Sequence, residues 1–240
     1  MKTSKFLIMS VCIIIIMPAC GSSIPKSLKN SFTYRFDDKY TGLDKLININ
    51  GYYREMSLIE RSPTVGGFLG DKSNYYVDTV FHYFMFYDNG IFVYNIRDVY
   101  NDDTKKPVKK DVSSFLKDFA ENSESLAAKQ FYMNFWGSYI ICGDTIKVQS
   151  VYKAMSFNDS WGVREDWYLI IDRNTLLCIN SFNLPITNHS QPKKRIQYPI
   201  TFHPIPAKPQ PYYSWILKEK WFWRYERDWN VFMNSLEKSK

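Results

Sequence analysis

The chain of 240 residues contains few of the side chains that enzymes and metal sites require. None of its three histidines, His82, His189 and His203, has a second histidine or a cysteine at metal-ligand spacing. A glycine-rich phosphate loop and a Gly-x-Ser-x-Gly nucleophile motif are also missing. Glu165 and Asp166 are adjacent in an expected strand, so their carboxylates point to opposite faces and cannot act as an acid pair. The sequence therefore indicates neither an enzyme nor a protein that binds a metal or a cofactor.

The chain also has only a small excess of positive over negative charge. The net charge is +7 and the mean hydropathy is −0.35. The basic residues are scattered, which does not indicate nucleic-acid binding, whereas mild positive charge suits acidic glycans or anionic lipid surfaces. Hydrophobic residues form 45% of the chain and aromatic residues 18%, which excludes a disordered protein. This length permits one domain or two small ones.

The single long apolar run lies at the N-terminus and predicts an export signal. Lys2 and Lys5 precede twelve nearly unbroken apolar residues, 6–17. The run is too short to span a bilayer, which needs about 20 residues, and it has the length of a signal-peptide core. Residues 1–19 are therefore expected to be removed on export.

Cys20 stands at the end of this signal. The small residues Ala19 and Gly21 flank it, and the segment resembles a bacterial lipobox. The resemblance implies that Cys20 is lipidated and anchors the protein in the bacterial cell envelope. Several acyl chains make such an anchor effectively stable. The alternative is an ordinary secreted protein in which this cysteine is incidental.

The residues that follow the anchor are polar. Residues 20–45 are rich in serine, lysine and asparagine and are expected to form a lipidated tether to a single domain, residues 46–240. Lipoproteins that reach the cell surface tend to carry acidic residues soon after the lipidated cysteine, and residues 21–31 contain none. This comparison implies the periplasmic face of the outer membrane.

From residue 47 onward the sequence predicts β structure. Eight runs are rich in aromatic and β-branched residues and are bounded by turn residues. They cover residues 49–59, 79–87, 91–99, 135–142, 145–154, 163–171, 175–182 and 197–203. Eight runs joined mostly as neighbours resemble an eight-stranded antiparallel up-and-down barrel, whose interior holds side chains or one small ligand.

Tight turns predict which strand residues face each other. Around residues 143–144, Tyr139 pairs with Val148 on an apolar inward face, while Ser138 and Gln149 lie on a wet outer face. Pairing across this turn therefore places Tyr139 inside the barrel.

A second turn, Asn89-Gly90, carries the strongest hairpin signal in the chain. A two-residue turn here pairs Tyr87 with Phe92 and Phe86 with Val93. Both faces of this hairpin are largely apolar, so we expect it to be covered on both sides.

A third turn, residues 173–174, pairs Trp167 with Asn180, with Glu165 on the same face. We interpret this face as inward. Glu165, Trp167, Asn180 and Tyr139 are then the predicted ligand-binding residues, with Glu165 as a polar anchor in an aromatic cavity. The alternative is that Glu165 lies at the open rim in contact with water, because a buried carboxylate without a partner is costly.

Two helices are predicted beside the strands. One covers residues 112–130 and is inserted between strands. The other covers residues 213–237 and is amphipathic, with an aromatic stripe expected to lie across the barrel or else to dock onto a membrane or partner. Trp223, Arg224 and Arg227 lie off this stripe and are predicted surface-contact residues.

Cysteine pairing is not expected in the folded domain. Cys12 is removed with the signal and Cys20 is lipidated, which leaves Cys142 and Cys178. The predicted register places these two on opposite faces of the sheet, so both are expected to be free thiols.

Three motifs give the chain a family resemblance. They are Gly51-Tyr52-Tyr53, Trp136-Gly137-Ser138-Tyr139 and the run of residues 143–149. On these residues the chain, over about 45–182, resembles lipocalin-like (calycin-type) β-barrel lipoproteins typical of Bacteroidetes. The resemblance implies a module that binds a small apolar or amphipathic ligand. The alternative is an interaction or structural lipoprotein whose barrel is filled and takes no ligand.

Overall fold

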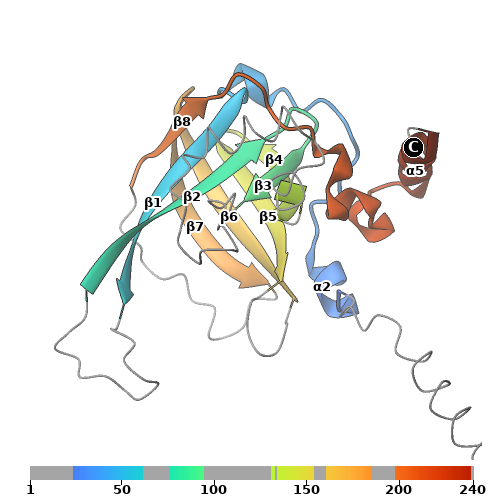
Figure 1. Ribbon diagram of the computed structural model, residues 1–240, viewed down its shortest axis with the longest axis horizontal. Coiled ribbons are helices and arrows are strands. Elements are labelled where there is room, and N and C mark those ends of the chain that lie inside the picture. Colours follow the sequence, from blue (N-terminus) through green and yellow to red (C-terminus); the bar gives the residue numbers. More distant parts are fainter. Residues whose placement is uncertain are drawn as a thin grey trace, which may run out of the picture.

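Eight antiparallel strands close into a barrel in the computed structural model, which describes residues 24–61, 76–94, 131–132, 134–153, 161–184 and 198–238 (Figure 1). The strands are β1 (Gly51–Arg61), β2 (Tyr76–Phe86), β3 (Ile91–Tyr94), β4 (Phe135–Cys142), β5 (Thr145–Lys153), β6 (Trp161–Asp172), β7 (Thr175–Leu184) and β8 (Ile200–Pro204). Each strand pairs with its neighbour in the chain, and β1 closes the barrel on β8. The predicted fold class, a mainly β up-and-down barrel, is confirmed.

The helical elements are short and lie outside the barrel wall. They are α2 (Lys26–Ser31), η1 (Leu43–Lys45), η3 (Pro211–Tyr213), η4 (Trp215–Lys218), η5 (Lys220–Phe222) and α5 (Glu226–Lys238). The predicted helix 213–237 is therefore wrong in its first half, where extended residues at Ser214, Glu219 and Trp223 separate three 3-10 turns. This broken path lets Ile216 and Phe222 both reach the barrel wall. The other predicted helix, 112–130, lies outside the described residues.

The hairpin between β4 and β5 follows the predicted register. Tyr139 pairs with Val148, and both side chains lie in the buried interior. A type II′ turn requires a positive φ at its first central residue and not at its second. Gly143, the first, has a φ of 64°, and Asp144, the second, does not have a positive φ. The glycine permits this left-handed conformation without the strain that a Cβ would add.

The hairpin between β2 and β3 differs from the prediction by one residue. Its loop has three residues, because the Tyr87 amide bonds to the Ile91 carbonyl at 2.9 Å and Gly90 takes a φ of 96°. Phe86 therefore pairs with Phe92, not with Val93. The expectation that both faces are covered is confirmed, since every residue of β3 is buried.

The apolar interior fills one end of the barrel. Its buried members are Leu43, Ile47, Tyr53, Phe84, Phe86, Phe92, Tyr94, Tyr139, Ile146, Val148, Tyr168, Leu176 and Ile200. Leu43 and Ile47 belong to the segment before β1 and close this end beside the β6–β7 turn, where the Arg173 guanidinium donates to the carbonyls of Asp44 and Lys45. The connections at the opposite end run through residues outside the described ranges.

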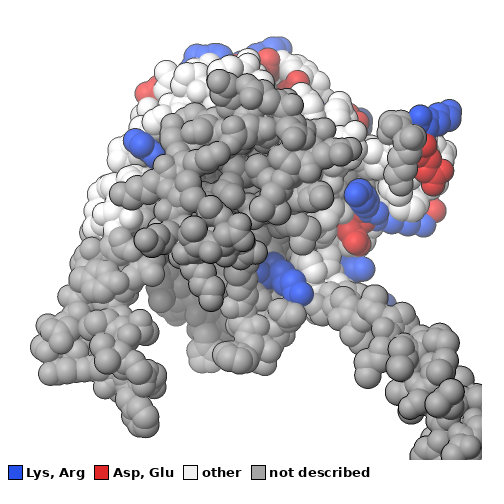
Figure 2. Space-filling view, viewed as in Figure 1, with Lys and Arg blue, Asp and Glu red and all other residues white. Residues whose placement is uncertain are grey.

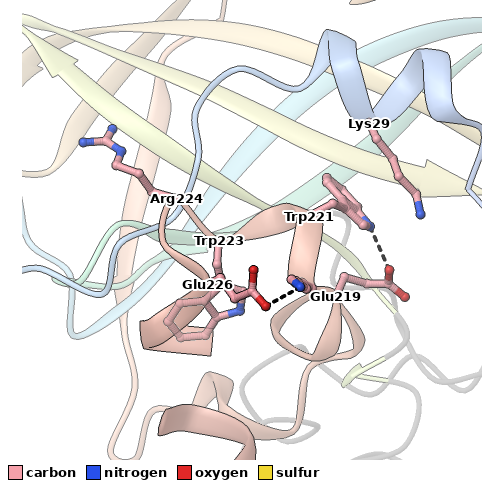
Figure 3. Close-up of a pocket in the computed structure, with 7 residues that line it drawn as sticks. Lys29, Glu219, Trp221, Trp223, Arg224 and Glu226 are labelled. Carbon is pink, nitrogen blue, oxygen red and sulfur yellow. Dashed lines mark hydrogen bonds and ion pairs between the residues drawn. The ribbon is translucent and has the colours of Figure 1, made fainter. Parts of the chain in front are cut away.

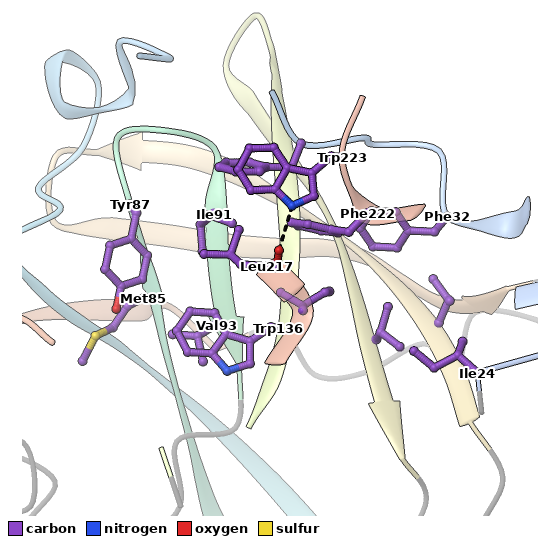
Figure 4. Packing of buried hydrophobic residues seen from close by; sticks show 14 of the residues in the cluster. Ile24, Phe32, Met85, Tyr87, Ile91, Val93, Trp136, Leu217, Phe222 and Trp223 are labelled. Carbon is purple, nitrogen blue, oxygen red and sulfur yellow. Dashed lines mark hydrogen bonds between the residues drawn. The ribbon is translucent and has the colours of Figure 1, made fainter. Parts of the chain in front are cut away.

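A second apolar cluster covers the outside of the wall (Figure 4). Ile24, Leu28, Phe32 and Phe36 pack there with the C-terminal turns over β2–β6. Residues from Ile24 onward are therefore part of the folded domain, and the predicted polar tether is wrong for them. The polar composition of this segment led to the wrong prediction because its apolar residues recur only every four positions.

This N-terminal cover also buries the predicted wet face of β4 and β5. Ser138 and Gln149 are 3% and 2% exposed. The Gln149 Oε1 atom accepts from the amides of Thr33 and Tyr34 at 2.7 and 3.1 Å, and the Ser138 hydroxyl donates to the Tyr34 carbonyl. The two polar side chains are thus satisfied by the backbone of the covering segment, which explains their burial.

The face of β6 assigned to the interior is the outer one. Trp167 does pair with Asn180, but two register shifts, between Trp167 and Tyr168 and between Ile170 and Asp172, change the pairing nearer the turn. The inward residues of β6 include Tyr168 and Ile170, which join the interior cluster. Since alternate residues point to opposite faces, Glu165 and Trp167 point outward.

The two cysteines of the domain are free thiols, as predicted. Cys142 is exposed on the outer face and Cys178 packs against the interior cluster.

Among the described residues, no helix is long and apolar enough to cross a membrane.

Candidate functional site

The inner face of β6 carries a polar layer directly beyond the apolar filling of the barrel. Arg164, Asp166 and Tyr168 follow one another at alternate positions of the strand and share its inward face. The Arg164 Nε atom donates to Asp166 Oδ1 at 2.8 Å, and the Asp166 side chain is 0% exposed. An ion pair is thus enclosed in the barrel at the boundary of its filled end.

Residues of β1, β2 and β3 complete this layer from across the barrel. The Arg164 guanidinium lies over the Tyr94 ring, 5.0 Å from its centroid. The His82 ring stacks on the same Tyr94 ring, with the two centroids 5.8 Å apart. The Tyr94 hydroxyl donates to Glu55 Oε2 at 3.4 Å, and Glu55 is 8% exposed. The layer therefore combines one guanidinium, one imidazole, two carboxylates and two phenols.

Three polar atoms of this layer have no hydrogen-bond partner among the described residues. They are Arg164 Nη2, Asp166 Oδ2 and the Tyr168 hydroxyl. Burial raises the pKa of Tyr168 well above its ordinary value, with further increases from Asp166 and Glu55. Although burial opposes its charge, the carboxylates raise the pKa of Arg164 well above the ordinary value, so Arg164 is a cation.

Buried polar groups in native proteins are nearly always paired. A satisfied network stabilises one structure, whereas each unsatisfied group costs about 1–3 kcal/mol. Three such atoms on one strand, all on its inward face, are therefore the strongest indication of a binding site in the part of the chain that the structure describes.

The predicted site residue Glu165 has a different environment on the outer face. Its carboxylate accepts hydrogen bonds from Gln149 Nε2 at 2.6 Å, Trp167 Nε1 at 2.6 Å and the Tyr34 hydroxyl at 3.0 Å. The N-terminal segment thus supplies the partner that the sequence argument required. Burial and the nearby Glu165 carboxylate raise the pKa of Tyr34, which keeps the phenol protonated as a donor.

The other predicted ligand-binding residues are also separated by the structure. Asn180 faces outward opposite Trp167. The Lys147 ammonium lies over the Trp167 ring, 4.1 Å from its centroid. Tyr139 does face inward but lies in the filled end, where its hydroxyl bonds to Thr41 and to the Tyr87 carbonyl. The predicted group of four is therefore not one site.

Two of the three predicted surface-contact residues, Trp223 and Arg224, line a shallow groove of about 530 Å³ between α2 and the C-terminal turns (Figure 3). Trp223 is only 6% exposed, because its ring packs on Phe36 and its Nε1 donates to the Leu217 carbonyl at 2.8 Å, so the expectation of a surface-contact ring is wrong. Arg224 is exposed and pairs with Asp37 at 3.3 Å. Arg227 is exposed on α5 and does not line the groove.

Both acidic side chains that line this groove are already bonded to other residues of its lining. Trp221 Nε1 donates to Glu219 at 2.7 Å, and Lys220 pairs with Glu226 at 2.5 Å (Figure 3). Blue and red atoms alternate over α5 and its neighbours in Figure 2, so this surface is not a basic patch. The groove therefore offers less to a ligand than the polar layer does.

Sequence reasoning missed the polar layer because it assigned β6 to the wrong face. One signal was available: Arg164 and Asp166 stand two positions apart in the strand, so one face must hold both of these opposite charges. Among the described residues, no group of three or more histidine, cysteine, aspartate or glutamate side chains is placed to hold a metal ion.

Comparison of the chain with protein-family models, curated proteins and solved structures found no match in any of the three.

Proposed function

We propose that this protein is a lipid-anchored binding module of the bacterial cell envelope, which holds a small amphipathic ligand inside its barrel. The ligand's polar end would lie on Arg164, Asp166 and Tyr168. The role we propose for these groups is to bind and orient the ligand.

The observation that carries this proposal is the set of three unpartnered polar atoms on the inward face of β6. A ligand that bonds to them would remove several desolvation penalties of about 1–3 kcal/mol each. Barrels of eight strands have room for side chains or one small ligand.

Retention of a ligand by the secreted, lipid-free chain tests the proposal. Because the described contacts lie between residues 24 and 238, the chain 21–240 contains the whole described fold. Native mass spectrometry of this chain, purified from the envelope of its own host, should show a bound small molecule. A spectrum of bare protein only would contradict the proposal.

Two tryptophan variants locate the ligand. Ser181 lies on β7 opposite Asp166 on the inward face, and Asn180 is its outward neighbour opposite Trp167. Ser181→Trp should fill the polar layer and abolish retention, while the matched control Asn180→Trp should retain the ligand. Equal retention by both variants would place the ligand elsewhere.

Anchoring through Cys20 is a separate part of the proposal, supported by the lipobox resemblance. Labelled palmitate should be incorporated into the wild-type protein and not into Cys20→Ala. Protease treatment of intact cells should leave the domain uncut, since the proposed location is the periplasmic face of the outer membrane.

The runner-up is an interaction lipoprotein without a small ligand. The filled end of the barrel favours it, because Phe84, Phe86 and Phe92 are 0–1% exposed and leave the interior there fully packed. Bare protein in the native spectrum, with unchanged behaviour of Ser181→Trp, would support this alternative.

A further inference from the structure

We infer that the buried end of the ligand is uncharged and carries hydroxyl or amide groups that both donate and accept hydrogen bonds. This inference rests on the proposed function and assigns a chemical class to its ligand. A carboxylate such as a fatty-acid head group is excluded by the same geometry, as is an alkylammonium group.

The unpartnered atoms require both kinds of hydrogen bond. Arg164 Nη2 can only donate, Asp166 Oδ2 can only accept while the carboxylate is ionised, and the Tyr168 hydroxyl can do either. A carboxylate ligand accepts but does not donate, so it would leave Asp166 Oδ2 unpaired. An ammonium donates but does not accept, so it would leave Arg164 Nη2 unpaired. A hydroxyl or a primary amide satisfies both.

The charges of the layer lead to the same class. Arg164 and Asp166 form an ion pair with a separation of 2.8 Å and no net charge. A charged ligand would lose its hydration on entering this enclosed layer, and the desolvation of an ion is costly. The second carboxylate, Glu55, lies near enough to raise the pKa of Tyr168, and it further disfavours an anion.

The wall beyond the polar layer is partly apolar. Phe135 and Tyr152 lie on the inward faces of β4 and β5 with their ring centroids 5.6 Å apart. Gly162 on β6 makes room for the Tyr152 ring, since a Cβ at this position would come within 2.4 Å of it. These rings offer an aromatic surface to the rest of a ligand whose polar end lies on β6, which suits an amphipathic molecule.

Three probes with one tail and different heads test this class. Octyl glucoside, octanoate and octylammonium, each below its micelle concentration, are titrated calorimetrically into the lipid-free chain 21–240. We expect octyl glucoside to bind at least about tenfold more tightly than either ion, since each ion leaves a buried group unpaired. Equal or tighter binding of octanoate or octylammonium would overturn the inference, and so would binding of none of the three.

Tyr168→Phe identifies the site of binding. This variant should weaken octyl glucoside binding about three- to tenfold, the loss of one neutral hydrogen bond. The matched control is Tyr53→Phe, because the Tyr53 hydroxyl lies in the filled end and donates to the Asn48 carbonyl at 2.9 Å. Equal affinity in wild type, Tyr168→Phe and Tyr53→Phe would overturn the assignment to the polar layer.

The two proposals fail in different ways. A ligand that co-purifies from the host but is charged would refute the uncharged class and leave ligand binding intact. A native spectrum of bare protein would refute ligand binding itself.

Discussion

Glu165 and Asp166 are neighbours in β6, yet the two carboxylates have opposite environments. Glu165 faces outward, is 7% exposed and accepts three hydrogen bonds from Tyr34, Gln149 and Trp167. Asp166 faces inward, is 0% exposed and leaves one carboxylate oxygen without a partner. The outer carboxylate thus has hydrogen-bond donors from the barrel and from the N-terminal segment, whereas the inner one keeps an acceptor oxygen that a ligand can bond to.

The largest expected effect comes from removing the inner charge. Asp166→Asn leaves the Arg164 guanidinium buried without its counter-charge, and we expect the free energy of unfolding to fall by about 3–5 kcal/mol. Urea denaturation followed by tryptophan fluorescence measures this loss. The control is the double variant Arg164→Met/Asp166→Leu, which removes both charges and should regain most of the stability. A double variant as unstable as Asp166→Asn would show that the ion pair itself stabilises the fold.

The outer carboxylate should give a smaller loss with a local consequence. Glu165→Ala leaves the Gln149 amide and the Trp167 indole without their acceptor, and we expect a loss of about 2–3 kcal/mol. The N-terminal segment should also loosen, because the Tyr34 hydroxyl loses its acceptor on the barrel. Limited proteolysis would then cut near Tyr34 faster than in the wild type. Unchanged cleavage there would show that the apolar contacts of Phe32 and Phe36 and the backbone bonds of Tyr34 to Gln149 and Ser138 hold the segment without Glu165.

Two tyrosines sharpen the comparison between the filled end and the polar layer. Tyr53→Phe removes a bonded hydroxyl and should cost about 1 kcal/mol of unfolding free energy. Tyr168→Phe removes a hydroxyl that has no partner among the described residues, so the ligand-free protein should be equally stable or more stable. Chemical denaturation of both variants without ligand decides this. A loss in Tyr168→Phe as large as that in Tyr53→Phe would contradict the assignment of an unsatisfied group.

Buried ionisable groups also make the stability depend on pH. Burial lowers the pKa of Lys208 from 10.5 to about 7, so the unfolded chain binds more protons between these values and stability should rise with pH across them. Burial raises the pKa of Tyr94 and Tyr168 above the ordinary 10.0, so stability should fall as the pH rises beyond about 10.

Urea midpoints measured from pH 6 to 12 test both limbs. Lys208→Met should flatten the rise between pH 7 and 10.5 and leave the alkaline fall unchanged. If the stability of Lys208→Met still rises between pH 7 and 10.5 as in the wild type, another group must cause that rise.

Strand positions were predictable from the sequence because aromatic and β-branched runs alternate with clear turn residues. The Gly143-Asp144 turn also gave the correct pairing of Tyr139 with Val148. The barrel was predictable because the eight strands pair in the order in which they follow one another in the sequence.

The faces of the strands were harder to predict. On β3 both faces are buried, so hydrophobicity does not distinguish the interior from the outside. On β6 the aromatic and aliphatic residues Trp167 and Leu169 lie outside, while the ion pair Arg164–Asp166 lies inside. The covering by residues 24–36 is a long-range contact, and local sequence pattern carries no signal for it.

A crystal structure of the chain 21–240, purified from its own host without added ligand, tests the central claim most directly. We predict electron density larger than a water molecule within hydrogen-bond distance of Arg164 Nη2, Asp166 Oδ2 and the Tyr168 hydroxyl. Density in which these three atoms are bonded only to ordered water molecules or to other side chains of the protein would contradict the account.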